Sequence, residues 1–447
     1  MIKVITYGTY DLLHYGHIRL LERAKELGDY LIVGITADDF DKYRGKINVE
    51  QSLMERIEAI KACGIADEII IEEYEGQKID DINRYDVDIF AVGSDWKGQF
   101  DYLNSYCKVV YLDRTEGISS SDLRKQVRNT RLGLVGETPV VQKYFDESSH
   151  VNGFDITSIY SANLEILKMF EGREVELTSD FNSFLELVDA VYIVSHPKEH
   201  YNHAKQALLA GKHVLCQSPI TLTKIEYQEL FSIAEKNNLI LMEGIKTAFS
   251  TAYHRLCLLA KGGTIGQIVS VDVACTRLEN MNVLEIKNMW DSMSVWGSTA
   301  MLPIFQLLGT DFLYKNIHSL YFDEEQNFDI FTKIDFTYSN AVASLKIGSG
   351  VKTEGELIIT GTKGYIYVPA PWWKTDYFEV RYEDSERNRR FFYQLEGEGI
   401  RYEMVAFLKA IDTGKMAPYI EEDVTKAMIK VFEHFYRKKS IFQISQS

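Results

Sequence analysis

Proline is missing from the whole first part of this chain. The 447 residues contain seven prolines, and none of them comes before Pro139. The composition therefore shifts along the chain, which indicates more than one domain. The length agrees, because 447 residues are too many for one ordinary domain and two or three are expected.

Cysteine is also scarce, and its spacing excludes two kinds of protein. No CxxC pair occurs among the five cysteines, which stand at positions 63, 107, 216, 257 and 275. This pattern argues against a disulfide framework and against a zinc knuckle. We expect reduced thiols, packed mostly in the interior.

Long apolar runs and an excess of positive charge are absent as well. No run reaches the ~18 residues of a membrane span, and no signal-peptide pattern follows Met1, so we expect a cytoplasmic protein. The formal net charge of −16 argues against nucleic acid as a partner. An apolar share of 46% and a charged share of 26% are ordinary for a globular enzyme.

The proline-free part alternates between strand-like and helix-like patterns. Strand-like runs cover residues 4–7, 30–36, 68–71, 89–92 and 108–112. Helical patterns lie between them, for example over residues 52–62. This alternation predicts an α/β fold with a small parallel sheet and helices on both faces. The charged and polar stretch 123–130 is the expected domain boundary.

Two histidines stand where a glycine-containing turn meets a helix-like run. The turn holds Gly8 and Gly16, the histidines are His14 and His17, and the helical pattern covers residues 18–27. The first turn of a helix attracts phosphate through its unpaired backbone N–H groups, and histidine can donate to phosphate oxygens. A zinc pair is the competing interpretation. Zinc on a helix more often uses an i, i+4 pair and a third ligand, so the i, i+3 spacing favours phosphate.

This segment resembles the HxGH signature of the cytidylyltransferase family. The similarity continues through three further runs in the family's order, at residues 20–30, 93–98 and 114–121. It covers about the first 125 residues. The resemblance implies a Rossmann-like nucleotidyltransferase domain with a parallel sheet at residues 1–128.

The resemblance also implies the reaction. A phosphate oxygen of a small polyol phosphate, most readily glycerol 3-phosphate, would attack the α-phosphorus of CTP and release pyrophosphate. The product, CDP-glycerol, would serve a cell-envelope polymer such as teichoic acid or capsule. Mg²⁺ is expected with CTP, because a triphosphate needs charge neutralisation, and no protein ligands are assigned to it. Ribitol, erythritol and related phosphates stay open as acceptors.

Roles for individual positions follow from the same resemblance. The catalytic set is His14, His17, Lys46 and Arg114. The nucleotide-binding set is Gly8, Thr9, Tyr10, Asp11, Gly16, Asp95, Thr115, Glu116, Gly117, Ile118, Ser119 and Ser120. The acceptor-binding set is Arg44, Arg56 and Lys78. Lys46 lies in a loop expected to close as a lid. Plainer interpretations stay open: Arg44 and Lys78 as solvated charges, and Asp95 as a turn or cap residue.

The rest of the chain resembles the Gfo/Idh/MocA-type oxidoreductases in the order of its patterns. The runs that carry the similarity are residues 131–137, 190–197, 211–220 and 361–369. The resemblance implies a Rossmann-like dinucleotide-fold domain at residues 131–245. An α+β domain with an open antiparallel sheet would follow at residues 246–447.

Several positions depart from that family's pattern. Glu137 stands in the dinucleotide turn, where a carboxylate would repel a pyrophosphate. The second strand ends at residues 159–161 without the acidic residue that normally holds ribose hydroxyls. Ser218 replaces the catalytic lysine, and Pro303 and Leu307 replace the downstream aspartate and histidine. None of these three side chains can act as a general acid or base at neutral pH, as a lysine, aspartate or histidine could.

Three roles for the second half therefore stay open. It is a scaffold that dimerises and positions the transferase, a regulatory module that binds a nucleotide or sugar, or an active NAD(P)-dependent reductase on a related polyol phosphate. The aromatic run 371–378 forms an interface, a ligand wall or ordinary packing. Both resemblances imply a homo-oligomer. A non-catalytic nucleotide sensor is the alternative for the whole chain, and the histidines and basic residues of the first half argue against it.

Overall fold

The computed structural model divides the chain into two compact units, Met1–Asn129 and Thr130–Ser447. It describes residues 1–37, 49, 51, 53–74, 76–113, 129–151, 153–279, 289–323, 328–393, 395, 397–416, 419–439 and 441–444.

The described residues of the first unit form a five-stranded, wholly parallel sheet in the order β3-β2-β1-β4-β5. The strands are β1 (Lys3–Gly8), β2 (Tyr30–Thr36), β3 (Glu68–Glu72), β4 (Ile89–Gly93) and β5 (Lys108–Leu112). The expected strand positions and the α/β class are thus confirmed. The central strands β1, β2 and β4 are buried on both faces, as continuous apolar runs in a parallel sheet require, whereas the edge strands β3 and β5 are mostly only partly buried.

Helices cover both faces of this sheet. They are α1 (Tyr15–Lys25), α3 (Leu53–Cys63) and α4 (Gln77–Tyr85), with short 3-10 turns η1 (Ser94–Trp96) and η2 (Asp101–Ser105). Val4 packs with Leu21 of α1 and Ile57 of α3, whereas the next residue, Ile5, packs with Ile82 of α4. This alternation is the period of two that a strand imposes on its side chains.

The second unit begins with a six-stranded parallel sheet in the order β11-β10-β9-β6-β7-β8. Its strands are β6 (Thr130–Val135), β7 (Phe154–Tyr160), β8 (Glu176–Thr178), β9 (Ala190–Ile193), β10 (His213–Gln217) and β11 (Leu241–Gly244). Its helices are α6 (Val140–Ser148), α7 (Leu164–Lys168), α8 (Phe181–Glu186), α9 (Pro197–Leu209) and α10 (Lys224–Lys236).

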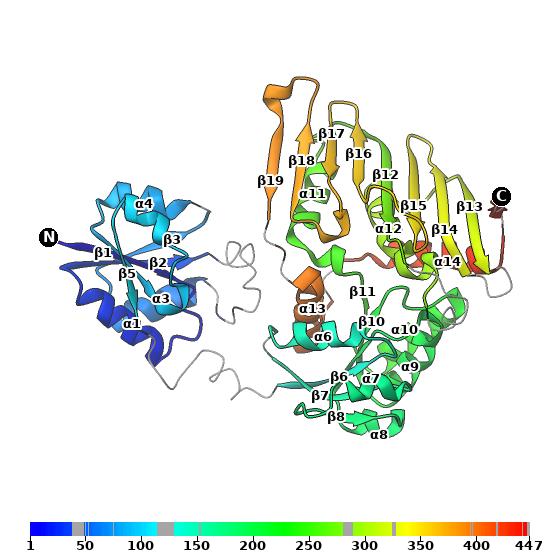
Figure 1. Ribbon diagram of the computed structural model, residues 1–447, viewed down its shortest axis with the longest axis horizontal. Coiled ribbons are helices and arrows are strands. Elements are labelled where there is room, and N and C mark those ends of the chain that lie inside the picture. Colours follow the sequence, from blue (N-terminus) through cyan, green and yellow to red (C-terminus); the bar gives the residue numbers. More distant parts are fainter. Residues whose placement is uncertain are drawn as a thin grey trace. The chain divides into compact units, whose positions relative to one another are not determined.

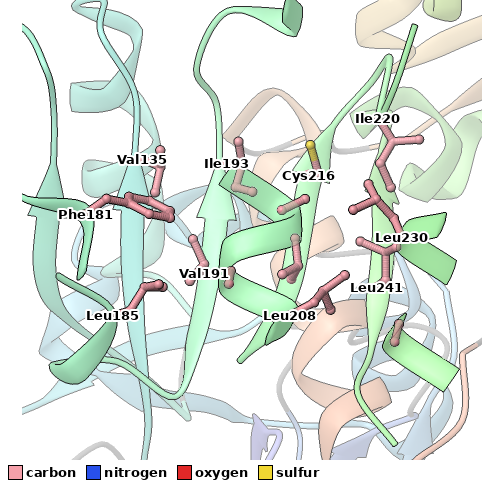
Figure 2. Packing of buried hydrophobic residues seen from close by; sticks show 14 of the residues in the cluster. Val135, Phe181, Leu185, Val191, Ile193, Leu208, Cys216, Ile220, Leu230 and Leu241 are labelled. Atoms are coloured by element: carbon pink, nitrogen blue, oxygen red, sulfur yellow. The ribbon is translucent and has the colours of Figure 1, made fainter. Parts of the chain in front are cut away.

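Side chains from these strands and helices fill one apolar core. Figure 2 shows Val191 and Ile193 of β9 pointing toward the same layer as Leu208 of α9 and Leu230 of α10. Local signals fix the helix starts. α10, for example, opens with a capping box in which Thr223 and Glu226 satisfy each other's backbone N–H groups.

The chain then forms a nine-stranded open sheet, whose strands β19 to β13 lie side by side in Figure 1. Its strands are β12 (Ile268–Thr276), β13 (Tyr314–Asp323), β14 (Phe328–Thr337), β15 (Val342–Gly348), β16 (Leu357–Gly361), β17 (Tyr365–Val368), β18 (Tyr377–Arg381), β19 (Arg389–Phe392) and β20 (Ile441–Gln443). Most pairings are antiparallel, as expected, but β12–β15 and β13–β20 are parallel, so the sheet is mixed.

Four helices and several 3-10 turns accompany this sheet. They are α11 (Thr251–Lys261), α12 (Ser292–Leu308), α13 (Ile400–Thr413), α14 (Glu422–Tyr436), η3 (Lys246–Phe249), η5 (Trp372–Lys374), η6 (Ser385–Arg387) and η7 (Gly397–Gly399). α12 lies against β12, β14 and β15 and packs with α14. In the part of the chain that the structure describes, no helix has both the length and the apolarity to cross a bilayer.

Cysteine burial is mixed. All five thiols are free; Cys216 and Cys275 are buried, and the other three are partly buried. Interior packing thus holds fully for two of them.

Two buried carboxyl groups meet where α12 starts on the sheet. Asp291 caps α12 and accepts hydrogen bonds from Ser294 and Tyr436, and Asp329 of β14 accepts from the Met293 N–H and from Thr332. Burial, and then the negative charge of Asp291, raise the pKa of Asp329 well above its ordinary value. The folded protein therefore favours the protonated form of Asp329 at pH values above those at which a free aspartate ionises.

This pair predicts a pH-dependent effect of Asp329→Asn. A carboxyl whose pKa is raised by folding stabilises the fold fully only below its unfolded pKa of about 3.9, and that contribution is lost as pH rises toward the folded pKa. Asparagine cannot ionise, so the unfolding midpoint of the variant relative to the parent should rise between pH 4 and pH 8. Calorimetry across this range measures the difference.

Asp335→Asn is the control, because Asp335 lies on the same strand, partly exposed and paired with Lys333. A difference between Asp329→Asn and parent that stays constant with pH would contradict the assignment of the proton.

Candidate functional site

The loop between β1 and α1 lies where the strand order of the first sheet reverses. From β1 the order runs to β2 and β3 on one side and to β4 and β5 on the other. In open parallel sheets, ligands bind outside the carboxyl ends of the strands at such a switch point. The loop, residues 9–14, begins at the carboxyl end of β1. The position of this loop in the sheet makes it a candidate ligand-binding site.

The loop has a constrained backbone. Tyr10 and Leu12 adopt left-handed conformations with φ of 53° and 47°, which costs a non-glycine residue about 1–2 kcal/mol. Tyr10 is buried and packs against Gly8, where an added Cβ would lie 2.9 Å from the tyrosine ring. Gly8 therefore makes room for Tyr10, and the loop is held in one shape by packing. Such strain is common at binding and catalytic sites.

His14 and His17 stack at the start of α1. Their ring centres are 3.8 Å apart with planes inclined by 23°, and Tyr10 contacts His17 edge-on at 5.6 Å. His14 caps the helix, because its Nδ1 accepts a hydrogen bond of 3.1 Å from the Gly16 N–H. Since Nδ1 accepts, a neutral His14 carries its proton on Nε2. The cap thus leaves Nε2 of His14 as a hydrogen-bond donor.

Asp11 ties the loop to the segment that precedes α3. Its Oδ1 accepts from the Gln51 N–H at 3.0 Å, and Gln51 Oε1 accepts from the Leu12 N–H at 2.8 Å. This reciprocal pair satisfies polar groups on both segments. Asp11 is buried and positions the loop.

Arg56 of α3 is fully buried beneath the same loop. Its Nη1 donates to the carbonyls of Thr9 and Thr36 at 2.7 and 2.9 Å, and its Nε donates to the carbonyl of Gln51 at 3.1 Å. The fork of guanidinium donors joins three backbone segments. The structure thus places Arg56 among main-chain acceptors, whereas the sequence suggested contact with the acceptor substrate.

Lys78 of α4 is also largely buried. It forms an ion pair with Glu72, which in turn accepts a hydrogen bond of 2.9 Å from Thr36 Oγ1. The ammonium lies 4.7 Å from the centre of the Tyr7 ring, within cation–π range. The interpretation of Lys78 as a solvated surface charge is therefore wrong for this structure.

The remaining sequence-derived candidates separate into two groups. Gly16 lies in the first turn of α1, and Asp95 is exposed in η1, directly after β4. Arg44, Lys46, Arg114, Thr115, Glu116, Gly117, Ile118, Ser119 and Ser120 lie outside the described residues. Gln51 and Glu72, which hold the loop and Lys78, were not found from the sequence. Neither belongs to a motif, so no local signal marks them.

Among the described residues, no three His, Cys, Asp or Glu side chains gather closely enough to hold a metal ion.

In the second unit, the turn after β6 contains a closely packed glycine, as a dinucleotide-binding turn does, but it also contains an acidic residue. Gly136 permits close packing, since an added Cβ would lie 2.4 Å from Val141 of α6. Glu137 follows it, and burial raises the pKa of its carboxyl. At the end of β7, Ser161 accepts a hydrogen bond from the Asn163 N–H, in the place of a ribose-binding carboxylate. In its ionised form, the carboxylate of Glu137 would repel a dinucleotide diphosphate.

Ser218, at the position where the resemblance led us to expect a catalytic lysine, is part of a network of hydroxyl groups. Ser218 donates to the buried Glu243, lies 2.6 Å from Ser298 Oγ, and shares Glu243 with Thr425. Burial raises the pKa of Glu243. Pro303 is buried inside α12. The network supplies packing and hydrogen bonds but no ammonium group.

A cavity of about 650 Å³ opens beside this network. It is lined by the strand ends at Gln217 and Gly244, by Trp296 of α12, and by Trp373 and Lys374 of η5. Trp373 belongs to the aromatic run 371–378, so part of that run does form a cavity wall. A cavity of this size accommodates a small-molecule ligand.

Comparisons with known proteins divide the chain at the same place. A cytidylyltransferase-like family model matches residues 5–126, and a model of the oxidoreductase family with an NAD-binding Rossmann fold matches residues 130–245. A glycerol-3-phosphate cytidylyltransferase of Bacillus spizizenii is 50% identical over 127 residues, which are 28% of this chain and 98% of that protein. The enzyme of the same name from Staphylococcus aureus is 49% identical over 130 residues, 28% of this chain and 96% of that protein.

For the second unit the similarity shows the fold alone. A 3-ketoreductase from Actinomadura kijaniata, solved in complex with NADP and TDP-benzene, matches with a TM-score of 0.63 and 18% identity. The match covers 71% of this chain and all of that chain.

The hydrogen bonds of Arg56 predict a loss of stability in Arg56→Met. Methionine fills much of the space but cannot donate, so buried carbonyls at Thr9 and Thr36 lose their partner. The unfolding free energy of the first unit should fall by about 2–4 kcal/mol. Calorimetry, with hydrogen exchange at α1 to assign the transition, measures the change. Lys61→Met is the matched control, because Lys61 is exposed on the same helix. Equal stability of the two variants would show that Arg56 does not hold the loop.

Proposed function

Because the chain belongs, through its first unit, to the glycerol-3-phosphate cytidylyltransferase family of nucleotidyltransferases, we propose that it makes CDP-glycerol and pyrophosphate from CTP and glycerol 3-phosphate. A phosphate oxygen of the acceptor attacks the α-phosphorus of CTP, and the bond from that phosphorus to the pyrophosphate breaks. No proton need be abstracted, since the acceptor phosphate is already an anion at neutral pH.

The observation that carries this proposal is the stacked pair His14 and His17 at the start of α1. The Gly16 N–H occupies Nδ1 of His14, so a neutral His14 carries its proton on Nε2, the nitrogen that we propose donates to a phosphate oxygen. The stacking holds both rings at the end of the helix that carries partial positive charge. Donors fixed before the reaction stabilise the charge that grows on the α-phosphate oxygens at no cost of reorganisation.

The rest of the loop keeps these donors in place. Gly8, Tyr10 and Asp11 fix its conformation, and Thr9 is held through its carbonyl by Arg56. We assign nucleotide contacts to this loop, to Gly16 and to Asp95. Lys46, Arg114 and the segment 115–120 complete the proposed triphosphate site.

For the acceptor phosphate, Arg44 and Lys78 are the proposed cations. Lys78 must exchange Glu72 for the acceptor if it binds directly, because that carboxylate is its ion-pair partner. Arg56 is proposed as a positioning residue that acts through the loop, since its guanidinium donates to backbone carbonyls.

Mg²⁺ would enter with CTP. The described residues offer no cluster of metal-ligating side chains, so the phosphates of the nucleotide would provide most of its ligands. When bound, it neutralises triphosphate charge; the residues named above do the positioning.

The second candidate function, an NAD(P)-dependent reductase, is favoured by one observation, the cavity at the ends of β10 and β11. Glu137 and Ser218 oppose it, the first by its charge in the dinucleotide turn and the second because a hydroxyl cannot replace a lysine as proton donor. We propose that the second unit is a scaffold or a regulatory ligand-binding module.

Further parts of the proposal concern cellular context. CDP-glycerol would supply a cell-envelope polymer such as teichoic acid or capsule. The reaction belongs in the cytoplasm, where CTP is available. We propose a homo-oligomer, which light scattering of the purified protein tests.

Two histidine variants test the transferase. His17→Ala should lower turnover by about 10²-fold or more, because it removes a donor to the developing charge. His14→Asn should lower turnover similarly, yet it keeps a side-chain acceptor for the helix cap and so should leave the unfolding midpoint nearly unchanged. Pyrophosphate release with CTP, Mg²⁺ and a panel of phosphorylated polyols is the measurement, with Lys61→Ala as the control. Near-parental rates in both histidine variants would remove the pair from the mechanism.

Glu137→Gln tests the dinucleotide. If the carboxylate is what excludes a pyrophosphate, parent protein should bind NADPH poorly and the variant should bind it at least about tenfold more tightly. Titration followed by NADPH fluorescence measures both. Tight binding of NADPH by the parent protein would instead support the reductase function for the second unit.

A further inference from the structure

Three lysines of the second unit converge on a single carboxylate at the edge of the cavity. Lys143 of α6, Lys246 of η3 and Lys374 of η5 all form ion pairs with Glu398 of η7, and all four residues line the cavity. The Lys246 ammonium is 3.0 Å from Glu398 Oε2. Three ammonium groups facing one carboxylate leave an excess positive charge at this edge, in a chain whose formal net charge is −16. Arg277 and Glu279 also line the cavity but pair with each other, and burial raises the pKa of the Glu403 carboxyl in the lining to about 7. This local excess suits an anionic ligand.

The carboxylate is held there by an unusual backbone. Gly397, Glu398 and Gly399 have φ values of 59°, 53° and 91°, so three successive residues are left-handed. Glutamate rarely adopts this conformation, and it persists only where the surroundings determine it. Partial burial acts to raise the pKa of Glu398, but the hydrogen bonds from Lys143 and Lys374 and the charge of Lys246 hold that pKa well below its ordinary value. Glu398 is therefore ionised at neutral pH and forms ion pairs with all three lysines.

Deeper in the same cavity, three polar groups lack hydrogen-bond partners among the described residues. They are Gln217 Oε1, Trp296 Nε1 and Glu403 Oε2. Tyr192 donates to the other oxygen of Glu403, and burial raises the pKa of Glu403 to about 7. Buried polar groups are seldom left unpaired, because desolvation without a bond is costly. Two acceptors and one donor in one cavity match the hydroxyl groups of a ligand.

The aromatic wall indicates the shape of that ligand. Trp296 and Trp373 lie with ring centres 4.8 Å apart and planes inclined by 56°, and Trp290 lines the same cavity. Indole faces pack well against the C–H groups of a polyol or sugar while the hydroxyls turn to polar partners. Charge, hydrogen bonding and aromatic surface thus favour one chemical class.

We propose that this cavity binds a phosphorylated polyhydroxy compound, with its phosphate among Lys143, Lys246 and Lys374 in the place of the Glu398 carboxylate. Gln217, Trp296 and Glu403 then pair with the hydroxyl groups. Glu398 is a built-in substitute for the ligand, and ligand binding requires the turn at residues 397–399 to release it. The site is independent of the histidine pair of the first unit.

The competing interpretation is a structural clasp, in which the three ion pairs only join η7 to its neighbours. The two interpretations differ in what Glu398→Gln does. If the ion pairs are only structural, Glu398→Gln weakens the contact between η7 and its neighbours, and the variant binds no phosphate compound. A binding site loses its internal competitor and binds phosphate compounds more tightly.

The experiment uses the full chain with Trp96→Phe, so that the remaining four of the five tryptophans lie in the second unit and three of them line the cavity. Tryptophan fluorescence is titrated with glycerol 3-phosphate, sorbitol 6-phosphate, glucose 6-phosphate, inorganic phosphate, and unphosphorylated glycerol and glucose. We expect saturable binding of at least one phosphorylated polyol or sugar. Glu398→Gln should tighten it, and Lys246→Met should weaken it, each by about tenfold or more. Lys236→Met, an exposed lysine on α10, is the control.

The remaining outcomes divide clearly. Binding only in Glu398→Gln supports the proposal, with the carboxylate as a strong competitor. Inorganic phosphate binding as tightly as the organic phosphates overturns the assignment of the hydroxyl partners, and equal binding of unphosphorylated glycerol or glucose overturns the phosphate site. No binding in either the parent or Glu398→Gln, or parental binding in Lys246→Met, overturns the proposal. Unfolding midpoints of each variant identify any that fail to fold, in which case Lys374→Met replaces Lys246→Met.

Discussion

The buried guanidinium of Arg56 joins the ends of two neighbouring strands to the segment before α3. Its donors satisfy the carbonyls of Thr9, Thr36 and Gln51, which would otherwise be buried without partners. With these carbonyls fixed, the strained loop from Thr9 to His14 has one conformation. The cap of α1 and the stacking of the two histidines follow from that conformation. A charged group that donates to three backbone carbonyls thus holds the loop that carries the two histidines.

Local patterns were enough to predict the fold class of the first unit, whereas the prediction for the second unit came from a family resemblance. The strand-like runs, the helix after the histidines and the parallel class of the first sheet depend on periodicity and on neighbours in sequence. Side-chain partners depend on tertiary contacts, and here the sequence was a poorer guide. The family resemblance made Arg56 and Lys78 candidates for acceptor binding, but no sequence pattern showed that backbone carbonyls pair with Arg56 and that Glu72 pairs with Lys78.

The lysine cluster of the second unit makes the same point more strongly. Glu398 lies 255 residues from Lys143 and 152 from Lys246, so no motif connects them. Around Ser218, the sequence departs from the pattern that the family resemblance implies. The structure adds a hydroxyl network on the buried carboxylate of Glu243 at this position.

The left-handed turn at residues 397–399 has a quantitative consequence. A tethered carboxylate competes at a fixed effective concentration, on the order of millimolar for a short connection. The cavity therefore has a response threshold that depends on how firmly the turn holds its backbone, and not only on how well a ligand fits. Changes at Gly397 or Gly399 would shift the concentration at which the site fills while leaving its chemical preference untouched. Selectivity and sensitivity are set by different parts of the molecule, so each can change without the other.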